Sequence, residues 1–113
     1  MIMTIIHVAT MLNRSTYLSE SEMKSALQGT YTYYEDDEVQ SQIHIDGDIV
    51  YYRDNLIVKK YIVESWNCRN GTIDNSGSNI FVTNLGNLRY HGNIYKKGGS
   101  WSPTPFHPLP NYE

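Results

Sequence analysis

The chain is poor in cysteine and, outside its C-terminal tail, in proline. Cys68 is the only cysteine among the 113 residues, which excludes an internal disulfide and any metal site built from several cysteines. We interpret it as a small, partly buried hydrophobic side chain. All four prolines lie in residues 100–113, so this segment cannot form a central strand. We expect it to run as an extended tail, anchored on the surface by Trp101 and Phe106.

The chain also lacks an excess of positive charge and a hydrophobic run of transmembrane length. Its formal net charge is −3, which argues against dedicated nucleic-acid binding. The apolar run at residues 1–12 is too short to span a bilayer, and the first basic residue, Arg14, follows it, unlike in a signal peptide. We expect a cytoplasmic protein, exported only if the true start lies upstream. We expect the apolar run to form a core element or a homo-oligomer contact.

Signatures of catalysis are missing as well. The sequence contains no G-x-S-x-G, no H-E-x-x-H, no glycine-rich phosphate loop and no paired Cys-His arrangement. Its four histidines are isolated in sequence, without the local pair spacing that a zinc site uses. We predict that the protein is not an enzyme and that it uses neither a cofactor nor a metal.

What the chain has in abundance is tyrosine. Its ten tyrosines lie mostly in short segments where aromatic and β-branched residues alternate with polar ones. That alternation is typical of half-buried β-strands. Turn signals, such as Asp36-Asp37, Asp46-Gly47 and Asn70-Gly71, recur along residues 30–97 at the spacing of an antiparallel meander. Of these, Asp46-Gly47 is typical of a type I′ hairpin.

One helix is predicted at about residues 20–28. Ser19 and Glu22 form an S-x-x-E capping box, in which each side chain satisfies a backbone N–H of the first turn. Gly29 then stands where a left-handed residue ends helices. The apolar face of this helix is narrow, so we expect it to lie across the sheet or to close one end of it.

These signals predict a mainly β fold. We expect a small antiparallel β-barrel or a strongly curved meander sheet, with one short N-terminal helix and an extended, proline-rich C-terminal tail. Residues 1–99 are expected to form a single β-rich domain, and residues 100–113 the tail. The rhythm of alternating strands and helices that marks a parallel sheet is missing.

At Gly29-Thr30-Tyr31 the chain resembles the lipocalin-like (calycin) barrels. In that family a short N-terminal helix precedes a glycine-x-aromatic motif on the first strand. The family's aromatic is usually tryptophan, whose place Tyr31 takes here. The resemblance implies a binding protein with its ligand or partner at the barrel mouth, and it makes Gly29 and Tyr31 structural positions. Because the chain is shorter than an eight-stranded lipocalin, a smaller or partly open barrel fits equally well.

We predict a non-catalytic binding protein that recognises a small ligand or a protein partner through a tyrosine-rich β-surface or barrel mouth. Alternation splits the tyrosines between the two faces of each strand, and we expect one set to line the interior. An apolar cavity of about 300 Å³ or more would favour a small ligand, whereas a filled barrel leaves function to the surfaces. The residues assigned to the site are Tyr31, Tyr33, Tyr51, Tyr61, Trp66, Tyr90 and Tyr95.

Two alternatives stay open. In the first, the chain is an acidic interaction or inhibitor protein that occupies a basic, nucleic-acid-binding site of its partner. The carboxylates of that docking site would be Glu35, Asp36, Asp37 and Glu38. In the second, the chain binds single-stranded nucleic acid through tyrosines and the basic residues of its second half. Residues 58–113 carry six basic and three acidic side chains, against three basic and nine acidic in residues 1–57.

Overall fold

The computed structural model describes residues 17–106. The apolar segment 1–12, with its predicted role in the core or in a homo-oligomer contact, lies outside the described residues, as does the tail beyond Phe106. Within residues 17–106, no helix combines the length and the apolar character needed to cross a membrane.

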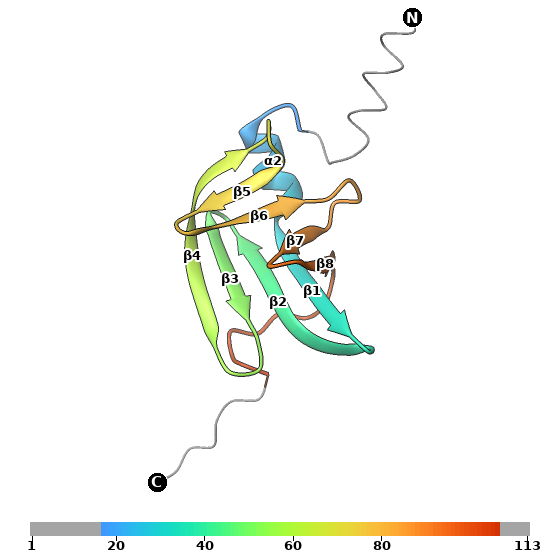
Figure 1. The fold of residues 1–113 in the computed structure, drawn as a ribbon. Helices are drawn as coiled ribbons and strands as arrows, with labels where there is room; N and C mark the ends of the chain where they lie inside the picture. Colours follow the sequence, from blue (N-terminus) through green and yellow to red (C-terminus); the bar gives the residue numbers. More distant parts are fainter. Residues whose placement is uncertain (1–16, 107–113) are drawn as a thin grey trace, which may run out of the picture.

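The described chain forms one short helix and eight antiparallel strands that close into a barrel (Figure 1). The helix is α2, Glu20–Leu27, and the strands are β1 (Gly29–Glu35), β2 (Glu38–Asp46), β3 (Ile49–Arg53), β4 (Val58–Asn67), β5 (Thr72–Asn75), β6 (Ser78–Val82), β7 (Leu88–Tyr90) and β8 (Asn93–Lys97). Each strand pairs with its neighbours in sequence, and β1 pairs with β8 to complete the ring. The predicted antiparallel barrel is confirmed, in a fully closed form.

The barrel closes despite the short chain because its later strands are short. β7 has only 3 residues and β5 only 4. Turn-forming residues, Asn70-Gly71 and Ser76-Gly77, lie on both sides of β5, but its 4 residues are too few for a clear alternation. The closing pair between β1 and β8 is equally brief, with Tyr31 opposite Lys97 and Thr32 opposite Lys96.

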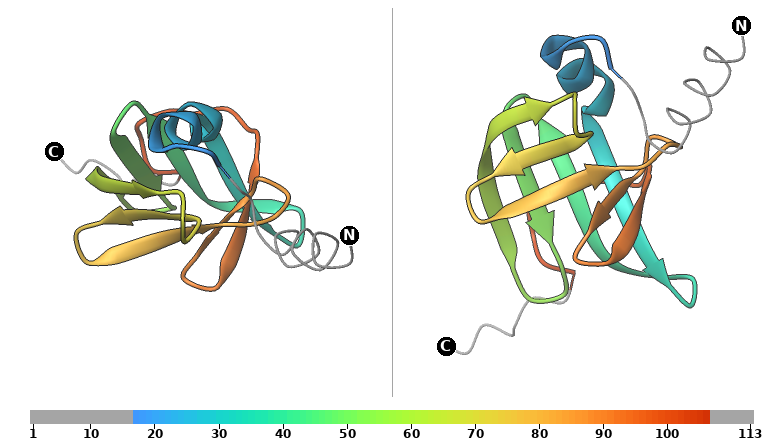
Figure 2. Two further views of the ribbon diagram at one scale, coloured as in Figure 1. Left: turned by 90° about the horizontal axis from the view of Figure 1, so that it is seen from above. Right: turned by 45° about the horizontal axis from the view of Figure 1, so that its top comes forward.

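The helix forms where the capping signal predicts it. The Ser19 hydroxyl accepts a hydrogen bond from the N–H of Glu22 at 3.1 Å, and Gly29 follows with a φ of 124°. The Glu22 carboxylate accepts from the N–H of Leu18 rather than from that of Ser19. Met23 and Leu27 are buried in the core, so α2 closes one end of the barrel, as the view along the barrel in Figure 2 shows.

The hairpin between β2 and β3 differs from the prediction by one residue. Asp46 pairs with Ile49, so the turn residues are Gly47-Asp48 rather than Asp46-Gly47. Gly47 has a φ of 63° and Asp48 has no positive φ, which is the pattern of a type II′ turn. The predicted type I′ pattern occurs instead in the turn Asp36-Asp37, where φ is 52° and 65°.

In an antiparallel meander, successive turns lie at alternate ends of the barrel. The turns at 47–48, 68–71 and 83–87 share one end with α2, here called the helix end. The turns at 36–37, 54–57, 76–77 and 91–92 lie at the opposite end, here called the open end. Between them the core fills the barrel axis, because α2 and every strand contribute at least one buried hydrophobic side chain.

Candidate functional site

The strand register decides which tyrosines face the interior. Tyr31, Tyr90 and Tyr95 belong to the buried core, and Tyr33 and Tyr61 pack against it, as predicted. The inward orientation that we predicted for Tyr51 is wrong. Its ring lies on the outside of the barrel, 5.7 Å from that of Trp101 and 6.1 Å from that of His44.

Tyr52 takes the inner position on β3 instead. It pairs with Ile43 of β2, which is fully buried, and its ring lies 5.9 Å from that of Tyr90. Alternation alone requires that one of Tyr51 and Tyr52 faces inward, but it does not say which one. That choice depends on the register with β2 and β4, and a shift of one residue would exchange the two faces.

Two of the predicted site residues lie toward the helix end and serve the fold. The Tyr31 hydroxyl donates to the carbonyl of Leu27 at 3.0 Å. The indole N–H of Trp66 donates to Asp48 Oδ1 at 3.0 Å. Burial raises the pKa of the Tyr31 phenol above its ordinary value, so this group is a neutral donor inside the core. Neither side chain reaches the open end.

Five tyrosines from five strands converge toward the open end, and we call them the tyrosine cluster. They are Tyr33, Tyr52, Tyr90 and Tyr95, with Tyr61 joined to them by a hydroxyl interaction with Tyr90. Adjacent rings meet at centroid distances of 5.7 Å for Tyr33 and Tyr95, 6.4 Å for Tyr90 and Tyr95, and 5.9 Å for Tyr52 and Tyr90. The arrangement is tilted or edge-on throughout, which is the favoured geometry for aromatic pairs.

The tyrosine cluster has a buried part and a half-buried part. Tyr90 and Tyr95 are buried, and their hydroxyls bond Ser78 Oγ at 3.4 Å and Ser41 Oγ at 2.7 Å. Burial raises the pKa of Tyr95 above its ordinary value. The other three rings, of Tyr33, Tyr52 and Tyr61, keep part of their surface exposed. These three rings are the ones available to a ligand.

Carboxylates lie next to the half-buried rings. The Tyr52 hydroxyl donates to Asp54 Oδ2 at 3.3 Å, and burial raises the pKa of Tyr52 above its ordinary value. Burial by itself would also raise the pKa of Asp54, but hydrogen bonds from the backbone N–H groups of Ile57 and Leu56 lower it below its usual value. Asp54 is therefore ionised at neutral pH, beside the neutral phenol of Tyr52.

The predicted acidic docking residues lie at this same end. Glu35, Asp36, Asp37 and Glu38 form the turn between β1 and β2, and all four are exposed. The Tyr33 hydroxyl lies 3.5 Å from Glu35 Oε2. A non-glycine residue at positive φ costs roughly 1 kcal/mol, and this turn holds two of them among four like charges. Strain of this kind often marks a functional surface.

One further ring at the open end was missed. His91 occupies the turn between β7 and β8 with a φ of 50°, and its ring stacks on Tyr90 at 3.9 Å and 19°. Nothing in the local sequence predicts this contact, because it depends on the unusual backbone conformation of the turn. We find no group of three or more His, Cys, Asp or Glu side chains in residues 17–106 that could hold a metal ion.

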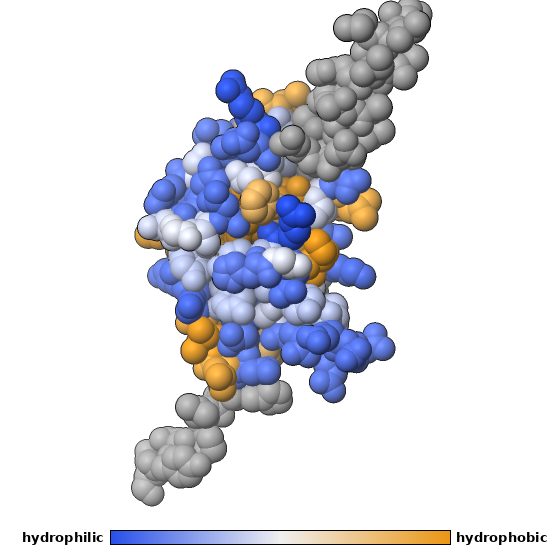
Figure 3. All heavy atoms as spheres, viewed as in Figure 1, coloured by the Kyte–Doolittle hydropathy of each residue, from blue (hydrophilic) through white to orange (hydrophobic). Residues whose placement is uncertain are grey.

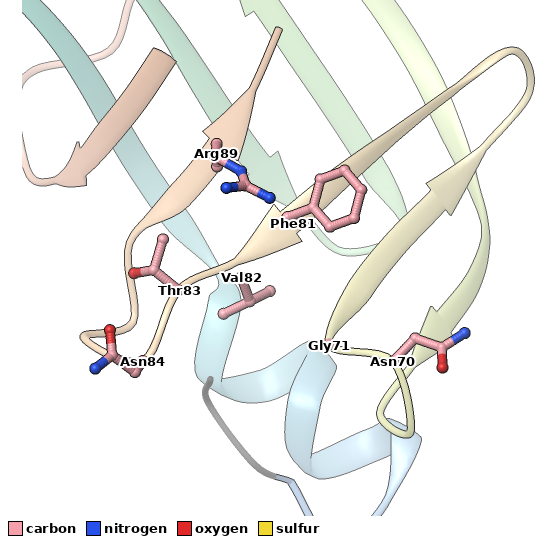
Figure 4. A pocket seen from close by; sticks show the side chains of 7 residues that line it. All are labelled: Asn70, Gly71, Phe81, Val82, Thr83, Asn84 and Arg89. Carbon is pink, nitrogen blue, oxygen red and sulfur yellow. The ribbon is translucent and has the colours of Figure 1, made fainter. Parts of the chain in front are cut away.

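A surface hollow of about 390 Å³ lies at the helix end and is lined in part by Trp66, Cys68 and Asn70. Two others lie along the barrel wall. One, of about 410 Å³, lies outside the barrel beside β6 and β7, where the Arg89 guanidinium sits 5.2 Å from the Phe81 ring centroid (Figure 4). Its lining includes no member of the tyrosine cluster. The other, of about 280 Å³, lies at the seam between β1 and β8 and is lined in part by Tyr33, Tyr34 and Ile94. It extends the open end along the barrel wall.

Two lysines lie next to the tyrosine cluster, because Lys59 pairs with Tyr52 and Lys96 lines the same hollow as Tyr33. Two other basic side chains lie elsewhere. Lys97 lies toward the helix end and donates to the carbonyl of Ala26, and Arg89 packs on Phe81. Lys59 is the lysine close enough to Asp54 to lower its pKa. The open end therefore combines aromatic rings with an excess of carboxylates, which differs from the aromatic and basic surface that single-stranded nucleic acid requires.

Comparison with protein-family models, with curated proteins and with solved structures finds no match for this chain. The resemblance to lipocalin-like barrels at Gly29 and Tyr31 stays a prediction.

Proposed function

We propose that the protein is a non-catalytic binding protein that recognises a basic protein partner at the open end of the barrel. The observation that carries this proposal is the convergence of the tyrosine cluster and the carboxylates of residues 35–38 at one end. Aromatic faces attract ammonium and guanidinium groups, and nearby carboxylates add direct charge attraction. Tyrosine also provides contact area at low entropic cost.

A protein partner is favoured over a small ligand held inside the barrel. Core side chains from α2 and from every strand occupy the barrel axis, so a ligand can enter only a short distance. A lysine or arginine side chain of a partner fits such a shallow site. Leu56 and Ile57, which are 61% and 41% exposed, add apolar contact area at the same end. Figure 3 shows exposed apolar side chains at its lower left, where Figure 1 places the loop between β3 and β4.

The second candidate, an acidic inhibitor of a nucleic-acid-binding protein, concerns the same surface. The exposure of all four carboxylates in the turn between β1 and β2 favours it, because solvated carboxylates are accessible to a basic partner. The two functions differ in what carries the affinity. In the preferred function the tyrosines contribute, whereas in the second the carboxylates alone are sufficient.

Binding of a labelled peptide of alternating lysine and serine, measured by fluorescence anisotropy at low salt, tests the proposal. We expect Tyr33→Ala to weaken binding about fivefold, through loss of a half-buried ring. The double variant Asp36→Asn/Asp37→Asn should also weaken it, and the effect should shrink as salt is added. A matched control, Glu20→Gln/Glu64→Gln, removes the same charge at exposed positions outside the open end.

The outcomes separate the candidates. Loss of binding in the aspartate variant but not in Tyr33→Ala would favour the acidic inhibitor. Equal losses in the aspartate variant and in the glutamate control would show that net charge alone matters, and the proposed site would be wrong. Preference for single-stranded oligothymidine over the basic peptide would favour the nucleic-acid alternative.

A further inference from the structure

The outer face of β1, β2 and β3 is covered by the chain's own C-terminal segment, residues 98–106, here called the strap. In Figure 1 the segment after β8 passes behind β1 and β2 and reaches the lower end of β3. Beneath it, Thr32, Gln42 and Arg53 form one row across the three strands, because they are paired in register. A second row, Thr30, His44 and Tyr51, lies beside the first.

The first row holds the strap by its backbone carbonyls. The hydrogen bonds go to the carbonyls of every second strap residue, as expected for a segment in extended conformation. The bonds run from Thr32 Oγ1 to Gly98 O at 2.7 Å, from Gln42 Nε2 to Ser100 O at 3.0 Å, and from Arg53 Nη1 to Ser102 O at 2.6 Å and Thr104 O at 3.1 Å. This recognition depends on the peptide backbone and not on most of the side chains of the strap.

Two aromatic anchors add the side-chain contacts. Trp101 stacks on His44 with a centroid distance of 4.8 Å and an interplanar angle of 8°. The Phe106 ring centroid lies 3.9 Å from the guanidinium carbon of Arg53. The strap leaves the barrel at Gly98 and Gly99, whose φ values are 128° and 106°. A Cβ at Gly99 would collide with Thr32 Oγ1, so only glycine allows this close approach.

The outer face beneath the strap, with its rows Thr32, Gln42, Arg53 and Thr30, His44, Tyr51, is here called the groove. The strap leaves two buried polar groups of the groove unsatisfied. Gln42 is 3% exposed and Arg53 is 8% exposed, yet Gln42 Oε1 and Arg53 Nε have no hydrogen-bond partner among the described residues. No carboxylate in residues 17–106 forms an ion pair with Arg53. Burying a cation without a counterion costs free energy. A ligand that brings a carboxylate to Arg53 would therefore bind more favourably there than the strap does.

The neighbouring charge has the same sign. Lys96 pairs with Thr32, and Lys60 pairs with Tyr51, so both lysines lie on the outer face at the borders of the groove. Both are exposed. The groove therefore offers an acidic ligand the buried Arg53 on β3, with one lysine at the β8 border and one at the β4 border.

We propose that this outer face is a docking groove for an extended, acidic segment of a partner protein, in which the strap acts as an intramolecular competitor. The partner segment would bring backbone carbonyls to Thr32 and Gln42, an aromatic ring to His44 and a carboxylate to Arg53. This site lies on the barrel wall and is independent of the tyrosine cluster.

The test uses the full chain and two labelled synthetic peptides. One has the sequence of residues 98–106, and the other carries Thr104→Glu, which places a carboxylate within side-chain reach of Arg53. We expect the acidic peptide to bind the variant Trp101→Ala/Phe106→Ala at least about tenfold more tightly than the unaltered chain, because the competitor has lost its anchors. Adding Arg53→Met to that variant should reverse the gain.

Several results would overturn the proposal. These are equal affinity for the acidic and the neutral peptide, no binding to the anchor variant, or preferential binding of oligothymidine. The ¹⁵N-resolved signal of the Arg53 Nε–H in the unaltered chain provides a measurement that needs no variant. A shift of that signal on addition of the acidic peptide supports the groove, and an unchanged signal at saturating peptide contradicts it.

Discussion

The two ends of this barrel differ in how they use their polar groups. At the helix end the side chains of Gln28, Tyr31, Asp48 and Trp66 bond to one another or to the backbone. At the open end rings keep exposed surface and carboxylates face solvent. The bonded groups of the helix end stabilise the fold, whereas the exposed rings and carboxylates of the open end are the surface at which we propose recognition.

The helix end is held by a small network around the β2–β3 turn. The Gln28 amide donates to the carbonyl of Gly47 at 3.0 Å and accepts from its N–H at 2.6 Å, as a neighbouring strand would. Asp48 accepts from Trp66 and also pairs with Lys24 at 3.0 Å. The hydrogen bond from Trp66, followed by that from Lys24, lowers the pKa of Asp48 below its usual value. Helix and hairpin are therefore coupled.

The largest expected effect is alkaline unfolding, to which both ends contribute. Burial raises the pKa of Tyr31, Tyr52, Tyr61 and Tyr95 in the folded chain. A group with a raised native pKa stabilises the fold below its unfolded value, about 10 for tyrosine, and loses that contribution as pH rises through the native value. We expect phenolate absorbance to rise in two phases, the later one coinciding with loss of the β circular-dichroism signal.

Two single variants distinguish the contributions of the two barrel ends to alkaline unfolding. Tyr52→Phe should move alkaline unfolding to higher pH with little change at neutral pH. Tyr31→Phe should also move it upward but should cost about 1 kcal/mol at neutral pH, because its hydrogen bond to Leu27 is lost. If all ten tyrosines ionise together near their ordinary pKa before the fold is lost, the assigned burial is wrong.

Leu27→Ala should destabilise the protein by about 2–5 kcal/mol, because it removes a buried side chain where α2 closes the barrel. Leu18→Ala is the matched control. Leu18 is 92% exposed, so its replacement should change the free energy of unfolding by less than about 0.5 kcal/mol. Urea unfolding of both variants gives the comparison, and similar costs would show that α2 does not close the core.

Gly47→Val should lower the free energy of unfolding by at least about 1–2 kcal/mol. Nothing lies within 4 Å of a Cβ placed at Gly47, so the penalty comes from its φ of 63° and not from a clash. Gly47→Asn tolerates this conformation better and should cost less. Thermal unfolding of the two variants distinguishes a backbone penalty from a steric clash. If a clash were the cause, the loss of stability would depend on the size of the side chain and not on its tolerance of positive φ.

Asp37→Gly should have the smallest effect, and it should raise the free energy of unfolding, by about 0.5 kcal/mol. Glycine relieves the positive φ of 65° and removes one of four adjacent negative charges. Asp37→Asn removes the charge but keeps a side chain, which separates the two contributions. A destabilised Asp37→Gly would mean that the turn between β1 and β2 is optimised for stability.

Local signals predicted the local structure well. Ser19, Glu22 and Gly29 marked both ends of α2, because caps depend on hydrogen bonds within one helical turn. Turn-forming pairs located most hairpins, although the β2–β3 turn was misplaced by one residue because Asp46, Gly47 and Asp48 all suit turns. Strands with fewer alternating positions, such as β5, gave too little signal to be named.

The sequence by itself determined the fold class, the helix and the approximate strand positions, because backbone preferences and side-chain alternation act over a few residues. Only the tertiary structure decided that β8 closes on β1, that Tyr52 and not Tyr51 faces inward, and that the tyrosine cluster meets the acidic turn at one end. It likewise decided that Thr32, Gln42 and Arg53 form one groove under the strap. These features depend on the register between strands that are distant in sequence, and that register is set by burying one face of every strand at once.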